Sequence, residues 1–374
     1  MAMSPSFDIL DDIDALSRDP ATVELIRAGR TMGCFYIESP GMRALLKRLD
    51  CSTFEMTVAA SSVIRPGVAE SGMMKAFIER HHDRSKVEYL HPALEEVLYE
   101  TYGVMIYQED VIKVACHVGG MSLGEADLLR RAMSGKMRSR EAMDRLTGKF
   151  FASCRRRGIP EDVAAEIWRQ IASFAGYSFC KGHSAAFAVL SYQCAWLKAH
   201  YPAEFMAAVL NNGGGFYGPA AYIQEARRMG LRVLGPDVNA SRTKYAGDTK
   251  GGWIRVGFQA IKNFPSDRIE AILKARAERP FDGLADLLER GGCSREEAGK
   301  LILAGACDGF GSTRAQLLLD LDLHFAERPN SAQPELFEGP SPPMTPQHVL
   351  KTDRGMVSGG RPEAAPMAFS KQRM

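Results

Sequence analysis

The spacing of apolar positions along the chain predicts a protein built mainly from α-helices. In the segment PATVELIRAG, apolar residues recur at helical spacing from Pro20 onward. Ser17 or Asp19 is placed to cap this helix, because proline suits the first helical turn, and Gly29 suits the position after the last turn. We therefore expect a helix over 20–28.

Several later segments repeat the helical period, and one does not. The run 42–49 and most of 92–157 have helical spacing, and within the longer segment Ser122 and Glu125 have the spacing of a capping box. The run GCFYIES, at 33–39, predicts a short strand instead. These segments indicate helices in series with little sheet.

Two helices differ in how their apolar residues are distributed. The segment 183–198 is apolar on nearly all sides, which predicts a buried helix. A basic helix ahead of it carries a single apolar stripe, so its arginine side chains should face outward. The stripe consists of Met143, Leu146, Phe150 and Cys154.

The pattern changes after Gly235. The run 253–261 predicts a strand, and the segments after it predict short helices joined by glycine-rich turns. From about Arg328 the chain is rich in Pro, Ser, Gly and Gln, which predicts disorder. The expected fold class is therefore mainly α with small α+β parts and a disordered tail.

Composition limits the class of protein further. With 374 residues and 45% hydrophobic content, the chain is long enough for two or three domains with their own cores. It holds no stretch of about 18 uncharged apolar residues, and its start, MAMSPSFDILDDIDAL, is acidic where a secretion signal is basic and then apolar. We therefore expect a cytoplasmic protein.

Cysteine spacing and local charge give two more indications. The eight cysteines show neither metal-ligand spacing nor a disulfide framework, so we expect buried thiols. Residues 130–157 contain ten Lys and Arg against two Asp and Glu, although the whole chain carries only +2. This concentration suits a phosphate-rich partner, and it equally suits a solvated helix face.

The basic segment contains a candidate phosphate site. Arg130 and Arg131 lie about 100° apart around one helix, so both guanidinium groups can face one groove. Lys136 can follow them from the end of that helix. Planar guanidinium groups that donate paired hydrogen bonds, together with the ammonium group of a lysine, suit the binding of a triphosphate.

A second candidate site stands where the apolar helix begins. Cys180, Lys181 and His183 occur together there. These residue types alone are compatible with a nucleophile pair, a metal site or a phosphate cradle.

Seven blocks of the sequence stand out over roughly residues 17–325, and they are GCFYIESPGM, SSVIRPG, YGVMIYQEDV, SLGEADLLRRAM, FAGYSFCKGHSAAFA, SYQCAWLKAHYPAEFMAAVL and GPDVNAS. In their order and approximate spacing they resemble the alpha subunit of bacterial DNA polymerase III. LNNGGGFYGPAAYIQEARRMGL is more similar to the error-prone branch. The resemblance implies a connector over 1–40, helical polymerase fingers over 41–235, a helix-hairpin-helix domain over 236–327 and a tail over 328–374.

The resemblance implies a role for both candidate sites. In this family the fingers grip the triphosphate of the incoming nucleotide. The family usually has G-F-N-K-S-H where this chain has Cys180 and Gly182 in place of the amide and the hydroxyl residue. The implied nucleotide-binding residues are Arg65, Arg130, Arg131, Lys136, Lys181 and His183.

The catalytic metal site of the family has no counterpart in the resemblance. Polymerases of this class align two magnesium ions with three palm aspartates, and the family places these upstream of the block GCFYIES. Asp8, Asp11, Asp12 and Asp14 match the connector, and we interpret them as a solvated acidic segment. We expect no catalytic residue and no metal or cofactor bound by this chain, and Mg²⁺ only in a complete polymerase.

The segment RVGFQAIKNFPSDRIEAILKAR resembles the family's helix-hairpin-helix module. That module binds duplex DNA through hairpin amides and a helix N-terminus, which makes Lys262, Asn263 and Arg268 candidate DNA-binding residues. The usual Gly-Val-Gly hairpin is replaced by Asn263, Phe264 and Pro265, and the proline removes one amide donor. A folded domain that binds DNA weakly is the alternative.

The tail contains QPELF at 333–337, which resembles the peptide by which polymerases bind the sliding clamp. In this interpretation Leu336 and Phe337 fill an apolar pocket while Gln333 is hydrogen-bonded.

Three functions follow from these features. The first is a C-terminal piece of a DNA-directed DNA polymerase of replication or error-prone synthesis. It would bind primer-template DNA, deoxynucleoside triphosphates and the clamp, and would be inactive unless a separate chain carries the palm. The second is a non-catalytic DNA- or clamp-binding accessory protein of replication or repair. The third, a thiol hydrolase using Cys180 and His183, lacks an oriented acid or oxyanion hole in the sequence.

Overall fold

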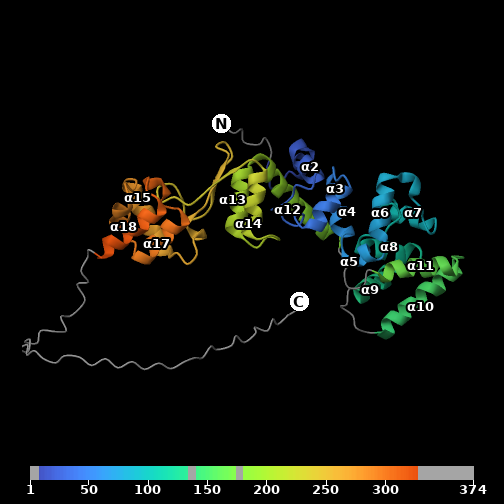
Figure 1. Ribbon diagram of the computed structural model, residues 1–374. Helices are drawn as coiled ribbons and strands as arrows, with labels where there is room; N and C mark the ends of the chain where they lie inside the picture. Colours follow the sequence, from blue (N-terminus) through green and yellow to red (C-terminus); the bar gives the residue numbers. More distant parts are fainter. Residues whose placement is uncertain (1–7, 134–139, 174–179, 327–374) are drawn as a thin grey trace, which may run out of the picture. The chain divides into compact units, whose positions relative to one another are not determined.

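The computed structural model describes residues 8–133, 140–173 and 180–326, most of which lie in helices (Figure 1). None of the helices in these ranges has both the length and the apolar character that a membrane span requires. Lys136 and the predicted clamp peptide, including Gln333, Leu336 and Phe337, lie outside the described residues.

Side chains cap the first four of the six N-terminal helices. The Asp19 carboxylate accepts the N–H of Thr22 at 2.8 Å, which confirms the expected start of α2, and Thr53 caps α4 in the same way. Each cap satisfies an N–H that has no partner within the helix. These helices are α1 (Ile13–Arg18), α2 (Pro20–Arg27), α3 (Pro40–Arg48), α4 (Phe54–Val63), α5 (Pro66–Glu70) and α6 (Met73–His82).

The following helices include the predicted capping box and the predicted basic helix. The N–H of Glu125 donates to Ser122, whose own N–H donates to Glu125, at 3.4 and 3.0 Å. The predicted stripe of α10 is confirmed, because Leu146, Phe150 and Cys154 are buried. The elements are η1 (Arg84–Lys86), α7 (Ala93–Leu98), η2 (Tyr99–Thr101), α8 (Gln108–His117), α9 (Leu123–Met133), α10 (Arg140–Arg156) and α11 (Glu161–Ala172).

The strand predicted over 33–39 is wrong, because this segment forms a series of turns. Gly33 and Tyr36 have positive φ angles of 87° and 68°, which no strand accommodates. The Thr31 hydroxyl donates to the carbonyl of Ile37 at 2.6 Å, and Glu38 accepts the N–H of Gly33 at 2.8 Å. The backbone groups that would pair with a neighbouring strand are therefore directed into the turn.

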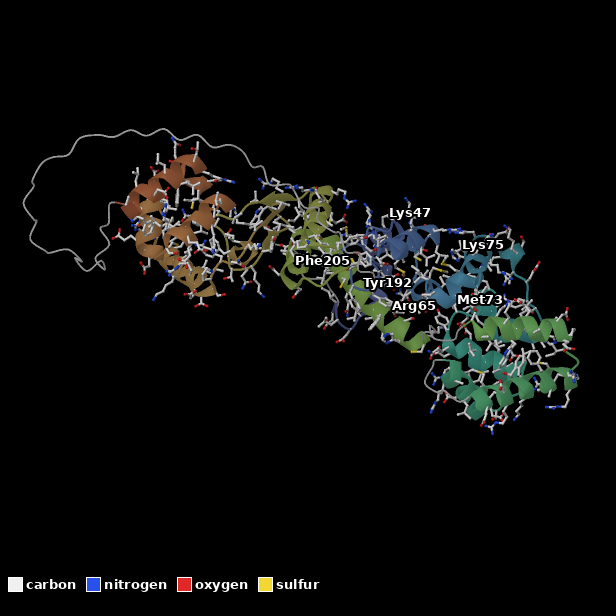
Figure 2. The ribbon with its side chains drawn as sticks, turned by 60° about the horizontal axis from the view of Figure 1, so that its bottom comes forward. Lys47, Arg65, Met73, Lys75, Tyr192 and Phe205 are labelled. Atoms are coloured by element: carbon white, nitrogen blue, oxygen red, sulfur yellow. The ribbon has the colours of Figure 1, made fainter. Side chains whose placement is uncertain are left out.

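The long helix α12 (Lys181–His200) packs against α1, α2, α4 and α13 (Pro202–Asn212). Tyr192, labelled in Figure 2, is fully buried beside Phe54, with 5.7 Å between the ring centroids. Contrary to the prediction, α12 is not buried on all sides, since Leu190 and Leu197 are exposed. Apolar composition therefore overstated the burial of this helix.

Lys198 of α12 is buried even though it is charged. Its ammonium group donates to the carbonyls of Arg30 and Met32 at 2.8 and 2.7 Å, and to Glu225 at 2.8 Å. Glu225 is on α14 (Pro219–Arg228) and also pairs with Arg228 at 2.9 Å. Lys198 therefore fastens α12 to both α14 and the turn after α2.

A three-stranded sheet follows α14, in the order β1-β3-β2. It comprises β1 (Arg232–Leu234), β2 (Ala246–Asp248) and β3 (Trp253–Arg255), with β1 parallel and β2 antiparallel to β3. The strand predicted over 253–261 is thus confirmed only for its first three residues. Ile254, at the centre, is fully buried, and Gly247 lies so close to the carbonyl of Ala203 that a Cβ atom would approach it to 2.2 Å.

A second buried cluster begins at Val238 and is built mainly from short helices. Three aromatic side chains, Phe258, Phe264 and Phe281, are buried in it. The elements are η3 (Phe258–Ala260), α15 (Ser266–Glu278), α16 (Leu284–Gly291), α17 (Arg295–Ala304), η4 (Asp308–Phe310) and α18 (Arg314–Ala326). The mainly helical fold with small α+β parts is confirmed for the described residues.

Candidate functional site

The predicted arginine pair lies at the end of α9 and shares one carboxylate. The Asp127 carboxylate accepts a hydrogen bond from Nε of Arg130 at 2.9 Å and forms an ion pair with Nε of Arg131 at 2.7 Å. The hydrogen bond from Arg130 is the largest cause that holds the pKa of Asp127 below its ordinary value. Arg131 is more exposed than Arg130, at 57% against 25% of the side-chain surface. The two guanidinium groups therefore meet at one carboxylate, that of Asp127.

The start of α8 joins this pair to Lys181. Arg130 donates from Nη1 to Gln108 at 3.1 Å. The next residue, Glu109, accepts the backbone N–H of Lys181 on both carboxylate oxygens, at 3.1 and 2.9 Å. Two adjacent side chains of α8 thus contact α9 on one side and the first residue of α12 on the other.

The buried Asp110 fixes this start of α8. Its carboxylate accepts the N–H groups of Ile106 and Tyr107 at 2.9 Å each, in a capping arrangement. Burial raises the pKa of Asp110 to about 6, against the lowering effect of these two donors. The turn before α8 is therefore held by a buried acidic group.

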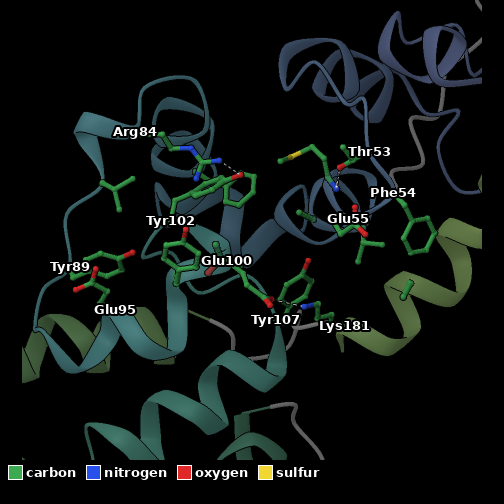
Figure 3. A pocket seen from close by; sticks show the side chains of 18 residues that line it. Thr53, Phe54, Glu55, Arg84, Tyr89, Glu95, Glu100, Tyr102, Tyr107 and Lys181 are labelled. Atoms are coloured by element: carbon green, nitrogen blue, oxygen red, sulfur yellow. Dashed lines mark hydrogen bonds and ion pairs between the residues drawn. The ribbon is translucent and has the colours of Figure 1, made fainter. Parts of the chain in front are cut away.

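The Lys181 side chain reaches a different carboxylate. Its Nζ atom lies 2.8 Å from Glu100 and 5.5 Å from the centre of the Tyr107 ring (Figure 3). The hydrogen bond from Lys181 is the main cause that lowers the pKa of Glu100. Both partners are substantially exposed, so the ion pair contributes little to stability and can exchange with another anion.

Arg65 and His183 belong to an aromatic cluster at the same end of α12. Arg65 donates to the hydroxyl of Tyr36 and lies over its ring, 5.4 Å from the centroid. The Tyr36 ring is 4.9 Å from that of Phe187, which is 4.0 Å from His183. The first turn of α12 thus carries Lys181, linked to α8, and His183, linked through aromatic rings to Arg65.

Several residues that organise this site were not among the sequence candidates. Asp127 could have been found, because an acid four residues before Arg131 has the spacing of a helical ion pair. Glu100, Glu109 and Tyr36 come from distant parts of the chain, so no local pattern predicts their contacts.

In the helix-hairpin-helix segment, two hairpin residues are exposed to solvent, whereas Arg268 is bonded to other residues of the same segment of the chain. Lys262 and Asn263 are exposed, and Asn263 has a φ angle of 55°, the left-handed conformation that a glycine would adopt. Phe264 is buried in the second cluster. Arg268 pairs with Glu297 at 3.2 Å and donates to the carbonyl of Gly291 at 3.0 Å.

The first turn of α15 contains one feature that opposes phosphate binding. Pro265 caps the helix without a side-chain hydrogen bond, and Asp267 places a negative charge in its first turn. A phosphate at this N-terminus would meet that charge.

Within residues 8–133, 140–173 and 180–326, no group of three His, Cys, Asp or Glu side chains is arranged to hold a metal ion. In the acidic N-terminal segment, Asp12 caps α1 and Asp8 accepts the N–H of Leu10 at 2.8 Å. These carboxylates support local backbone structure.

Comparison with known proteins connects these regions to one family. Residues 7–158 match the finger domain of the bacterial DNA polymerase III alpha subunit, and residues 230–317 match a helix-hairpin-helix motif. The DNA polymerase III alpha subunit of Bacillus subtilis is 39% identical over 317 residues, covering 83% of this chain and 28% of that protein. The one from Pseudomonas aeruginosa is 41% identical over 303 residues, covering 78% and 26%. The chain therefore spans little more than a quarter of the length of these relatives.

Proposed function

Since the chain belongs to the bacterial DNA polymerase III alpha subunit family, of which it carries the finger and helix-hairpin-helix regions, we propose that it binds the incoming nucleotide and DNA during synthesis. The triphosphate would be held by Arg130, Arg131 and Lys181. The observation that carries this proposal is the start of α8, where Gln108 contacts Arg130 and Glu109 contacts Lys181.

The proposed phosphate site is prepared by carboxylates that hold the cations in place. Asp127 orients the arginine pair. Glu100 forms an ion pair with the Lys181 side chain, and Glu109 accepts its backbone N–H. A triphosphate carries more charge than any of these groups and offers oxygens that accept paired hydrogen bonds. It would replace the exposed carboxylates around Lys181 and engage the exposed face of Arg131.

Arg65 and His183 would contribute from the aromatic cluster, and Lys136, outside the described residues, is included because the family resemblance implies it. Arg65 is half-buried and already bonded to Tyr36, so it would serve mainly to position that ring. His183 is exposed on the first turn of α12 and can donate a hydrogen bond to phosphate when protonated.

We propose that this chain is catalytically inactive by itself. Nucleotidyl transfer in this class requires magnesium ions held by aspartates, which the resemblance places in a palm ahead of the fingers. Mg²⁺ would then act only once those aspartates are supplied, for instance by a separate chain. Primer extension with Mg²⁺ tests this proposal: the chain alone should add no nucleotide, and incorporation that disappears in Arg131→Ala would overturn it.

Two further partners are duplex DNA and the sliding clamp. Duplex DNA would contact Lys262 and Asn263 at the hairpin, whereas Arg268 serves the domain core through Glu297. The sliding clamp would bind Gln333, Leu336 and Phe337. Replacing Leu336 and Phe337 together by alanine should abolish clamp capture, and unchanged affinity would remove this partner.

A role in error-prone synthesis is proposed from the segment LNNGGGFYGPAAYIQEARRMGL. Its exposed Phe216 donates its backbone N–H to the Glu38 carboxylate at 2.6 Å. A non-catalytic DNA- or clamp-binding accessory role in replication or repair is the second candidate, and it requires the same binding residues without catalysis.

Nucleotide binding is tested directly with a fluorescent deoxynucleoside triphosphate. Arg131→Ala and Lys181→Ala should each weaken binding about tenfold, since each removes a charged hydrogen-bond donor. Arg155→Ala is the matched control, because Arg155 is an exposed cation on α10. Equal loss in all three variants would mean that only overall positive charge matters, and the proposed site would be wrong.

A further inference from the structure

A large cleft opens beside Lys181, and neither Arg130 nor Arg131 lines it. It has a volume of about 880 Å³ and is lined by residues of α4, α6, α7 and α12 and of the segments between α6 and α8 (Figure 3). This size lies within the range of about 300–1,000 Å³ that is typical of small-molecule sites. The cleft can therefore hold a complete small ligand.

The walls of the cleft are apolar and rich in tyrosine. Tyr102 and Tyr107 are almost fully buried, whereas Tyr99 is 73% exposed at the rim. Burial raises the pKa of Tyr107, so its hydroxyl stays neutral. Phe77 and Val58 add buried apolar surface. A flat aromatic ligand would find stacking partners and apolar contacts on several sides.

Two tyrosine rings of the cleft already receive cations. The guanidinium of Arg84 lies 3.9 Å from the centre of the Tyr102 ring, and its Nη2 donates to the hydroxyl at 3.2 Å. The ammonium of Lys181 lies 5.5 Å from the centre of the Tyr107 ring. The faces of these rings carry negative electrostatic potential, so they attract cations and repel anions.

The carboxylates of the cleft exceed its cations. Glu100 is paired with Lys181, but Glu55 and Glu95 have no ion-pair partner among the described residues. Burial and then the negative charge of Glu95 raise the pKa of the neighbouring Tyr89. Glu95 and Tyr89 lie at one end of the cleft and Glu55 at the other (Figure 3). A phosphate in this space would face uncompensated negative charge at both ends.

We propose that this cleft binds a small organic cation with a planar aromatic body. The aromatic part would lie among Tyr99, Tyr102 and Tyr107, and the positive charge would be balanced by Glu55 or Glu95. The cleft shares Lys181 with the proposed nucleotide clamp, but the predicted ligand class is opposite in charge to a nucleoside triphosphate.

Proflavine is a suitable probe, because it is planar, fluorescent and positively charged at neutral pH. The protein freed of nucleic acid should bind it saturably and gain thermal stability as ligand is added. The double variant Glu55→Gln with Glu95→Gln should weaken binding about tenfold, because both unpaired charges are lost. Uncharged acridone, with a similar ring system, should bind more weakly than proflavine.

The matched control is Glu96→Gln, an exposed carboxylate next to Glu95 that does not line the cleft. Glu96→Gln should bind proflavine as tightly as the unaltered chain does. Equal affinity of the double variant and this control would overturn the proposal, as would the absence of saturable binding. Glu55 and Glu95 are not among the residues proposed to hold the triphosphate, so this experiment does not depend on the triphosphate proposal.

Discussion

The carboxylate of Glu109 accepts the backbone N–H of Lys181 on both of its oxygens, at 3.1 and 2.9 Å. A side chain of α8 thereby closes the N-terminus of α12, the position at which helix ends bind phosphate. Glu100 neutralises the Lys181 side chain at the same time. The free protein thus holds two carboxylates at the position where the proposed function places the triphosphate.

Replacing these carboxylates should therefore tighten triphosphate binding. Glu100→Gln and Glu109→Gln combined should raise the affinity about fivefold, because each removes a negative group that competes for Lys181. A titration with a fluorescent deoxynucleoside triphosphate measures the effect, and Glu96→Gln serves as the control on α7. An affinity that falls instead would mean that the carboxylates support the nucleotide rather than compete with it.

Lys198 should be essential for stability. Lys198→Met would leave Glu225 without one of its two cations and the carbonyls of Arg30 and Met32 without a donor. The free energy of unfolding should fall by about 3 kcal/mol, which urea unfolding can measure. The exposed Lys47, labelled in Figure 2, provides the control Lys47→Met, which should change little. Similar losses in both variants would contradict the structural role of the buried pair.

Asp110 should make stability depend on pH. Its pKa is about 6 in the folded protein against an ordinary value of 3.8, so the folded state keeps the proton that the unfolded state releases. Its contribution is present at low pH and is lost as the pH rises from about 4 to 6, by about 2 kcal/mol.

The effect of Asp110 is isolated by comparison with Asp110→Asn. Other carboxylates, such as Glu125 with its lowered pKa, act in the opposite direction in both proteins and cancel. Urea unfolding at pH 4, 5, 6 and 7 should show the unaltered chain losing stability relative to the variant. A constant difference across this range would show that Asp110 does not titrate there.

The hairpin residue Asn263 should tolerate glycine but not alanine. At a φ angle of 55°, a Cβ atom without a compensating polar group costs about 1 kcal/mol, whereas glycine adopts this conformation freely. Thermal unfolding of Asn263→Gly and Asn263→Ala measures the difference, and each variant is the control for the other. Equal stability of the two would mean that the left-handed conformation imposes no cost.

Local sequence patterns predicted many elements correctly. Proline and Asp19 marked the start of α2, Ser122 and Glu125 marked that of α9, and one apolar stripe identified the buried face of α10. These signals work because capping and periodicity act over three or four residues. The strand predicted at 33–39 is wrong because apolar spacing does not reveal what fixes this turn. The hydrogen bond from Gly33 to the Glu38 side chain and the positive φ angles of Gly33 and Tyr36 decide its conformation.

By itself the sequence determined the family, the helical composition and which cations are available for phosphate. It could not determine what those cations contact. Lys181 contacts Glu100 and Glu109, which lie 81 and 72 residues away in the sequence, and the cleft beside it forms only when α4, α7 and α12 are packed with the segment before α8. Electrostatic contacts depend on distance in space, so only the tertiary structure decided that the phosphate candidates begin paired with carboxylates.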